Sequence, residues 1–150
     1  MTQQTDLALN GVLIDMARSF LQYVAESWPW VTSDGQSVEN QVLVIAERQR
    51  QDVADIAALL NDREHFIDFG TFPTEYTDLQ FLALGALFAP IHNSQAIVLA
   101  SIASALQQVR AADDEEAETL LAAVEIRQKE AAAALKELQQ ELTKSGSTVA

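Results

Sequence analysis

The chain lacks cysteine altogether and has few basic side chains, nine Lys and Arg among 150 residues. Without cysteine there is no disulfide framework, no thiolate zinc site, no iron–sulfur cluster and no cysteine nucleophile. The 22 acidic side chains bring the formal net charge to −13. Because contacts to phosphate require clustered Lys and Arg, this charge argues against binding to nucleic acid or to an anionic membrane surface.

Long apolar runs and N-terminal addressing signals are missing as well. The nearest approach to a membrane span, Leu79 to Ile91, is interrupted by a glutamine, a glycine and a proline, whereas a span needs about 18 apolar residues. The N-terminus lacks the basic start of a secretory signal. We therefore expect a cytoplasmic protein with a single domain over residues 1–150, whose short tails, about 1–4 and 145–150, are flexible.

No segment shows the alternating pattern of a strand, but apolar residues, 49% of the chain, recur at helical spacing. Pro90 predicts a kink in the third helical segment or two stacked helices there. Asp113 is expected to cap the fourth. Arg48 and Asp52, four residues apart, are expected on the outer face of the second. The four predicted helical segments are Thr5–Trp28, Ser37–Asn61, Asp78–Arg110 and Asp113–Lys144.

The lengths of the connections predict the topology. Roughly nine residues join the first two helices and about two join the last two, which suits antiparallel neighbours. About sixteen residues, Asp62 to Thr77, separate the second helix from the third. A helix of about 25 residues is about 37 Å long, and sixteen extended residues reach about 50 Å. We therefore expect an all-α protein, a four-helix bundle with one long crossover between helices two and three.

This layout and three short stretches resemble the ferritin-like superfamily, in particular its small bacterial four-helix-bundle members. The stretch Glu47–Asp52, Glu-Arg-Gln-Arg-Gln-Asp, is similar to their Glu-Arg-x-His-type stretch. Phe72–Asp78 leads into an apolar third helix as theirs does, and Glu125–Gln128 lies where a second Glu-x-x-His would fall. The resemblance covers about residues 5–143. It implies a ferritin-like bundle with a di-iron site at its centre.

The departures from that pattern weaken the metal site. A di-iron centre takes one Glu from each of two helices and Glu-x-x-His from each of the other two. Here Arg50 follows Glu47 by three residues, and Gln128 follows Glu125 by three. A guanidinium cannot ligate a metal ion and repels it. The two histidine ligands are therefore missing.

The other two helices are equally poor in ligands. The first offers Asp15 at best, and residues 79–110 contain no carboxylate, so that Gln95 or Asn93 would fill the remaining position. The histidines, His65 and His92, lie outside the motifs. We expect no metal and no other cofactor. The degenerate candidates for the centre of the bundle are Asp15, Glu47, Gln49, Arg50, Gln95, Glu125 and Gln128.

Gln49 and Gln128 interrupt apolar stripes at positions that the spacing turns inward. They form either a polar ligand layer in place of the metal or buried amides that are hydrogen-bonded across the bundle, and we favour the second interpretation. Arg50 could form an ion pair with Glu47 or Glu125, so that its positive charge replaces that of the metal. Glu125 precedes Lys129 by four residues, an order that favours an exposed ion pair.

Aromatic residues and a histidine complete the candidates. His92 is expected to bond carbonyls freed by Pro90, and because no nucleophile or paired carboxylates accompany it, catalysis is not favoured. Trp28 and Trp30 are expected to cap one end of the core. The crossover aromatics either pin this segment to the bundle, which we favour, or form a recognition surface: Phe66, Phe69, Phe72 and Tyr76.

The third helical segment points to association. Of the 31 residues from Leu79 to Val109, 20 are apolar and none is charged, more than one core-facing stripe needs. A second buried face indicates a homodimer with a twofold axis. Its expected interface residues are Phe81, Leu84, Phe88, Leu99 and Ala103.

The leading hypothesis is thus a non-catalytic ferritin-like bundle that acts through protein association, as a homodimer. The alternative is a ferritin-like di-metal (iron or manganese) oxidase or iron-handling protein with an atypical ligand set, Asp15, Glu47 and Glu125. A third hypothesis is a small-molecule pocket between the helices, lined by apolar residues and by Gln49 or Gln128. The charge of −13 also leaves a basic protein partner open.

Overall fold

The structure, a computed structural model, describes residues 2–27, 35–73, 76 and 84–147. Five helices make up its regular structure, and within these ranges there is no strand. The helices are α1 (Thr2–Ala17), α2 (Phe20–Ser27), α3 (Gln36–Asp62), α4 (Leu84–Ala111) and α5 (Glu115–Ser147). The all-α prediction is confirmed for this part of the chain.

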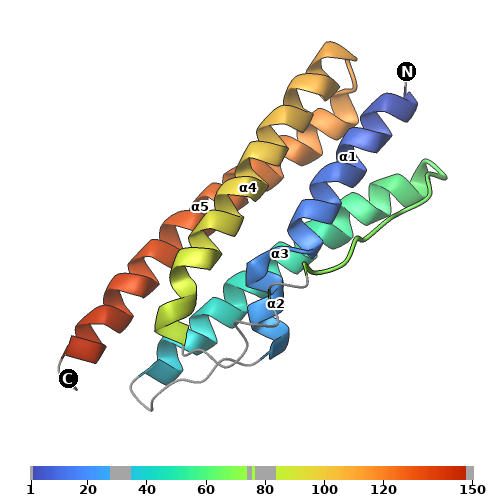
Figure 1. The fold of residues 1–150 in the computed structure, drawn as a ribbon. Helices are drawn as coiled ribbons and strands as arrows, with labels where there is room; N and C mark the ends of the chain where they lie inside the picture. Colours follow the sequence, from blue (N-terminus) through green and yellow to red (C-terminus); the bar gives the residue numbers. More distant parts are fainter. Residues whose placement is uncertain (1, 28–34, 74–75, 77–83, 148–150) are drawn as a thin grey trace.

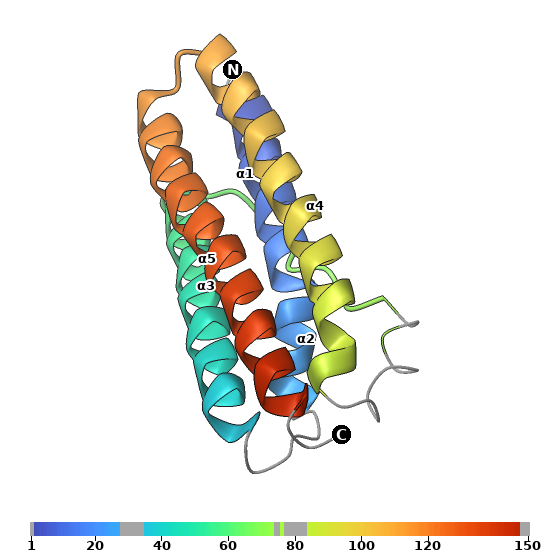
Figure 2. The same ribbon diagram turned by 90° about the vertical axis from the view of Figure 1, so that its left-hand side faces the viewer.

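The helices lie side by side, with α2 continuing roughly where α1 ends (Figures 1 and 2). α1 packs against α3 and α4, α5 packs against the same two helices, and α2 also contacts α3 and α4. Each long helix therefore has two long neighbours. α1 begins at Thr2 and α5 ends at Ser147, so the expected flexible tails belong in part to helices.

The first predicted helix, Thr5–Trp28, is broken in two at Arg18 and Ser19. The Phe20 amide donates to the Ser94 hydroxyl of α4 at 2.8 Å instead of to a carbonyl of α1. The Ser19 hydroxyl accepts from the Gln22 amide at 3.4 Å, as the N-cap of a new helix does. Because serine offers the backbone an alternative to the helical bond, the chain stops and restarts here.

α4 runs through Pro90 as one helix. Of the two alternatives expected at Pro90, a kink or two stacked helices, the second is therefore wrong for the described residues of this segment. The carbonyl that loses its amide partner belongs to Ala86, four residues earlier. Ala86 is exposed, so water can satisfy this carbonyl. His92 does not have the expected role: its Nε2 lies 2.8 Å from Gln139 Oε1 of α5.

α5 is capped by Asp114 and not by Asp113 as predicted. Asp114 Oδ1 accepts from the Ala117 amide at 3.2 Å, and the Glu118 amide donates to the Asp114 carbonyl at 2.9 Å. Asp113 has φ 56° and belongs to the turn after α4. Asp adopts a positive φ more readily than most residues. Asp113 therefore occupies the tight turn, and the next residue, Asp114, is the N-cap of α5.

The core consists of two hydrophobic clusters, one toward each end of the molecule. The first includes Leu13, Ile56 and Val124, and the second includes Leu84 and Phe88. Leu84 and Phe88 are therefore buried inside a single chain and do not belong to the association surface that we expected. Of the other predicted interface residues, Leu99 is half-buried, Ala103 is exposed, and Phe81 lies outside the described residues.

Residues 63–73 leave the end of α3 and run along α1. The Asn10 side-chain amide donates to the Asp68 carbonyl at 2.7 Å, and the Asp68 amide donates to Asn10 Oδ1 at 3.0 Å. Further on, the Tyr76 ring packs edge-on against Phe20 with centroids 4.8 Å apart, and the Phe72 ring lies 5.3 Å from Tyr23. These contacts pin the segment to α1 and α2.

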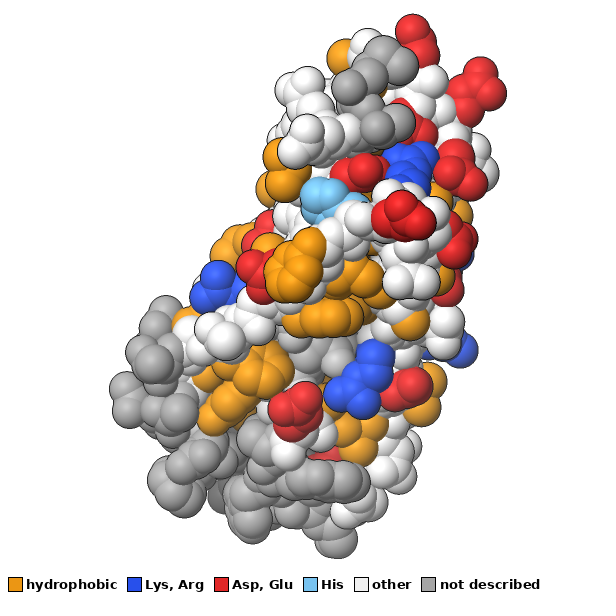
Figure 3. All heavy atoms as spheres, turned by 90° about the vertical axis from the view of Figure 1, so that its right-hand side faces the viewer, with side chains coloured by type: hydrophobic (Ala, Val, Ile, Leu, Met, Phe, Trp, Pro, Cys, Tyr) orange, Lys and Arg blue, Asp and Glu red, His pale blue; other side chains and the backbone are white. Residues whose placement is uncertain are grey.

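The expected pinning is wrong for the other two aromatic residues of the segment. Phe66 is 84% exposed and Phe69 is 52% exposed. Figure 3 shows hydrophobic side chains on this side of the molecule, below a group of charged side chains. The two tryptophans that we expected to cap the core, Trp28 and Trp30, lie outside the described residues.

Replacing Gly70 with alanine is expected to destabilise the protein by about 1–2 kcal/mol. Gly70 has φ 70°, and a Cβ there would lie 2.8 Å from Ile14 Cγ2 of α1. The measurement is urea unfolding followed by circular dichroism. The matched control is Gly85→Ala in α4, whose Cβ would make only ordinary contact, 3.6 Å from Leu142 Cδ2. An equal loss in both variants would contradict the role of Gly70.

Candidate functional site

Five polar side chains form a buried amide layer between the two core clusters: Ser19, Gln22, Gln49, Gln95 and Gln128. Gln49 is its centre. Its Oε1 accepts from Ser19 Oγ at 2.9 Å and from Gln22 Nε2 at 3.0 Å. Its Nε2 donates to Gln95 Oε1 at 3.1 Å and to Gln128 Oε1 at 3.0 Å. The Gln49 side chain, which is fully buried, thus uses all its hydrogen-bonding capacity.

The remaining members of the layer complete the network. Gln95 Nε2 donates to Gln128 Oε1 at 2.8 Å and to the Gln128 carbonyl at 3.2 Å, and Gln22 Nε2 donates to the Ala46 carbonyl at 2.7 Å. In the described part of the chain, every buried side-chain nitrogen and oxygen has a partner. Our interpretation of Gln49 and Gln128 as buried, hydrogen-bonded amides is confirmed, and Gln95 joins them. The layer joins α2, α3, α4 and α5. Sliding one of these helices along another would break its buried hydrogen bonds, so the layer fixes the register of the helices.

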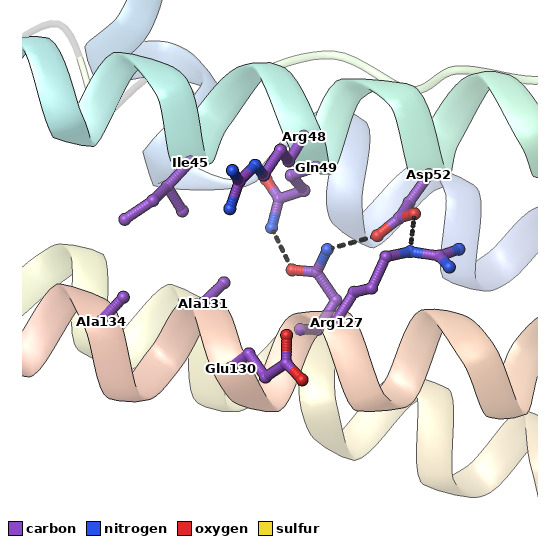
Figure 4. A pocket seen from close by; sticks show the side chains of 9 residues that line it. Ile45, Arg48, Gln49, Asp52, Arg127, Glu130, Ala131 and Ala134 are labelled. Carbon is purple, nitrogen blue, oxygen red and sulfur yellow. Dashed lines mark hydrogen bonds and ion pairs between the residues drawn. The ribbon is translucent and has the colours of Figure 1, made fainter.

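A buried carboxylate extends the layer on one side. Asp52 is 2% exposed; its Oδ1 accepts from Arg127 Nε at 2.7 Å and its Oδ2 from Gln128 Nε2 at 2.7 Å (Figure 4). The expected outer-face pair of Asp52 with Arg48 is therefore wrong. The partners of Asp52 come from α5, about 75 positions later in the chain, and helical spacing in α3 alone does not reveal them.

The charged candidates for the centre of the bundle are not brought together. Asp15 lies beside a groove between α1 and α4, Glu47 is exposed on α3, and Glu125 lies 3.7 Å from Lys129 in the expected ion pair. Arg50 is exposed and pairs with Glu26 of α2 at 3.5 Å. The predicted pairing of Arg50 with a site glutamate is therefore wrong.

The residues present do not fit a di-metal centre. Within the described ranges, no group of three or more His, Asp or Glu side chains is placed to hold a metal ion. The carboxylate beside the amide layer, Asp52, is already neutralised by a guanidinium. The atypical ligand set of Asp15, Glu47 and Glu125 is spread over separate faces.

A second polar cluster, the Arg63 cluster, lies where α3 ends and α5 begins. Arg63 Nη1 donates to Asp6 Oδ1 at 2.9 Å and to Asp114 Oδ2 at 2.8 Å. Nη2 donates to Asp114 Oδ1 at 2.8 Å and to Glu116 Oε1 at 3.1 Å. The Thr5 hydroxyl donates to Asp114 Oδ2 at 2.8 Å. One guanidinium therefore joins the start of α1, the end of α3 and the start of α5.

The hydrogen bonds of the Arg63 cluster shift the pKa values of Asp114 and Arg63 in opposite directions. The hydrogen bonds from Arg63 lower the pKa of Asp114 from 3.8 to about 2, against the opposing effect of burial. The same hydrogen bonds, which Arg63 donates to the Asp114 carboxylate, raise the pKa of Arg63 above its usual value. This cluster was not predicted from the sequence. Its one local signal is a single cation, Arg63, between Asp62 and Glu64.

The outward surface of α1 and α4 is apolar and nearly uncharged. Leu7 is 60% exposed and Ile97 is 62% exposed. They border a groove of about 560 Å³. α4 contains no Asp or Glu, and its one charged residue is Arg110. We call this surface the α1–α4 face; its groove is lined by Leu7, Ala8, Gly11, Asp15, Ile97, Ala100, Ser101, Ser104, Ala105 and Gln108.

α4 is also long and apolar enough, by length and composition, to cross a membrane. The relevant 18-residue window has a mean hydropathy of 1.3, and 39% of it is buried inside the protein. A core helix meets the same criterion, and α4 contributes Phe88, Val98 and Ile102 to the two core clusters. The excess apolar character of α4 is therefore shared between the core and the α1–α4 face.

Comparison with protein-family models gives no match, and comparison with curated proteins gives none either. The amide layer, the Arg63 cluster and the α1–α4 face are therefore the observations on which a function can rest.

Proposed function

We propose that this chain is a non-catalytic helical bundle of ferritin-like architecture that acts through protein association, and that a second copy of the chain docks on its α1–α4 face. The observation that carries the proposal is the absence of acidic residues from the whole of α4, in a chain with a net charge of −13.

The low charge of the α1–α4 face favours a second copy of the chain as its partner. Two identical chains of net charge −13 repel each other wherever their acidic surfaces meet. In a twofold dimer the same patch is used by both subunits, so each acidic residue in it enters the interface twice. Among the described residues that line the groove of the α1–α4 face, Asp15 is the one acidic side chain. Electrostatic repulsion between two copies is therefore weakest when they meet at this face.

Shape supports the same partner. Gly11, Ala100 and Ser104 leave room for a neighbouring helix, while Leu7 and Ile97 project beside the groove. In a twofold arrangement the projecting side chains of one copy enter the groove of the other. α4 is about 42 Å long at 1.5 Å per residue. A stable dimer buries roughly 800 Å² per partner, so the surface of α1 has to join that of α4 in the interface.

The course of the chain supports the ferritin-like architecture. α1 and α2 together occupy one position beside α3, α4 and α5 (Figure 2). The segment after α3 starts at the Arg63 cluster, next to the beginning of α5. α4 begins beside the other end of α5, where Leu84 and Leu138 share a core cluster. A connection that joins these two ends is the long crossover that distinguishes this class of bundle from a simple up-and-down one.

The test is the oligomeric state of the purified chain and of Ala100→Glu. We expect a dimer at micromolar concentration, measured by light scattering after size exclusion. Ala100→Glu places like charges opposite each other in a closed interface and is expected to weaken the dimer at least about 100-fold. The control is Ile126→Glu, which replaces a residue of α5 that is 59% exposed and should leave the dimer unchanged.

A wild-type chain that is monomeric at tens of micromolar would contradict self-association. Persistence of the dimer in Ala100→Glu would contradict the choice of face. If the monomer instead binds neutral phosphatidylcholine vesicles and Ala100→Glu does not, the α1–α4 face is a membrane surface.

A further inference from the structure

A hollow lies between α3 and α5, next to the amide layer, and is a candidate site for a small-molecule ligand. Its volume is about 340 Å³, within the usual range of small-molecule sites. Ala131 and Ala134 of α5 leave it open, and Ile45 of α3 forms an apolar wall. Gln49 and Gln128 line it next to Asp52 (Figure 4), held in place by their own hydrogen bonds. The inner wall of the hollow is therefore held in place by hydrogen bonds between α3 and α5.

Two side chains of opposite charge, one from each helix, line this hollow. Arg48 belongs to α3 and Glu130 to α5, and both line the hollow (Figure 4). In the described part of the chain, neither makes a hydrogen bond or an ion pair, whereas the neighbouring Arg127 is bound to Asp52. A ligand that carries both charges would satisfy both side chains.

The hollow continues along the two helices. A second hollow of about 320 Å³ shares Ile45, Arg48 and Ala134 with the first. Glu137 and Glu141 of α5 border this continuation. Along α5, seven residues separate Glu130 from Glu137, or about 10 Å at 1.5 Å per residue. The groove thus presents Arg48 and Glu130 at the first hollow, and Arg48, Glu137 and Glu141 at the second. Arg127 also lines the first hollow, but it is paired with Asp52.

We propose that this groove binds a free basic amino acid such as lysine. Its α-carboxylate pairs with Arg48 and its α-ammonium with Glu130. Its methylene chain lies against Ile45 and Ala134, and its distal ammonium lies near Glu137 and Glu141. The negative charge of the whole chain also attracts a ligand with a net positive charge. The groove lies between α3 and α5, so this binding is independent of association through the α1–α4 face.

The ligand side of the test is a panel of four compounds, titrated into the protein by calorimetry at low ionic strength, where exposed charge pairs are least screened. L-Lysine has all three charges. Norleucine lacks the distal ammonium, 6-aminohexanoate lacks the α-ammonium, and cadaverine lacks the carboxylate. Lysine is expected to bind saturably, and each analogue at least about fivefold more weakly, the effect of losing one solvent-accessible charge pair.

The protein side uses Arg48→Gln and Glu130→Gln, with Arg50→Gln and Glu47→Gln as controls, because the two controls change exposed charges of α3 that do not line the groove. Both groove variants are expected to bind lysine at least about fivefold more weakly, and the controls to bind it as the wild type does. In Glu130→Gln, lysine and 6-aminohexanoate should bind equally, because the partner of the α-ammonium is gone. Circular dichroism checks that each variant keeps its helices.

Three results would overturn the proposal. The first is the absence of saturable lysine binding at millimolar concentration. The second is cadaverine binding as tightly as lysine, which would mean that the acidic surface attracts any diamine. The third is unchanged lysine affinity in Arg48→Gln. None of these results bears on the oligomeric state, so this proposal and the proposed function fail separately.

Discussion

Replacing Gln49 with alanine is expected to lower the free energy of unfolding by about 4 kcal/mol. The Gln49 side chain is fully buried and bonds to four other side chains of the amide layer. Its removal leaves the Ser19 hydroxyl and the Gln22 amide short of an acceptor, and Gln95 and Gln128 short of a donor. Buried polar groups without partners cost about 1–3 kcal/mol each, and the cavity adds to that cost.

Two further variants separate the causes of this loss. Gln49→Met keeps most of the side-chain volume but offers no comparable hydrogen bonds, so a loss of about 2–3 kcal/mol is expected from the polar term. Gln51→Ala, on the same helix, removes an exposed amide that bonds only to Asp55, and its effect should stay within about 0.5 kcal/mol. Urea unfolding measures all three. A Gln49→Met protein as stable as the wild type would show that the amide layer contributes no net stability.

Replacing Arg63 with methionine is expected to lower the free energy of unfolding by about 3 kcal/mol. The guanidinium is the shared partner of Asp6 and Asp114, whose side chains are 7% and 11% exposed. Without it, two largely buried carboxylates face each other across the junction of α1, α3 and α5. The control is Arg110→Met, which breaks an exposed ion pair with Glu118 and should cost less than about 1 kcal/mol.

The Arg63 cluster also predicts how stability depends on pH. The folded-state pKa of Asp114 is about 2, below its usual 3.8. Its contribution is therefore present above about pH 4 and is lost as the pH falls toward 2, a loss of about 2 kcal/mol at 1.36 kcal/mol per unit. Arg63→Met should show a smaller loss over this range, because the hydrogen bonds that lower the pKa are gone. Urea midpoints measured across this acidic range check the prediction, and parallel curves for the two proteins would contradict it.

The positions of the main helices follow from local patterns. Helical spacing predicted a segment at Ser37–Asn61, and α3 covers Gln36–Asp62. The same spacing placed Gln49 and Gln128 on inward faces, where both are buried. These predictions succeeded because periodicity is a property of neighbouring residues, and burial of an amphipathic helix acts on that same period.

The break between α1 and α2 did not follow from local patterns. Apolar residues continue at helical spacing across Arg18 and Ser19, and the helix stops because Ser94 of α4 captures the Phe20 amide. In the same way, Asp52 looked like an outer-face residue until α5 supplied Arg127 and Gln128. In each case the deciding partner belongs to another helix.

The sequence alone was enough to indicate an all-α chain, its main helical segments, the inward glutamines and the absence of any Glu-x-x-His motif, because each of these depends on residues within a few turns of one another. The arrangement of the helices decided which polar groups pair. The bonds between two side chains in the Arg63 cluster and the amide layer join positions from 27 to 109 residues apart, and such partners depend on how whole helices dock. The exposure of the α1–α4 face has the same origin: packing buried Leu84 and Phe88 and left Ile97 outside.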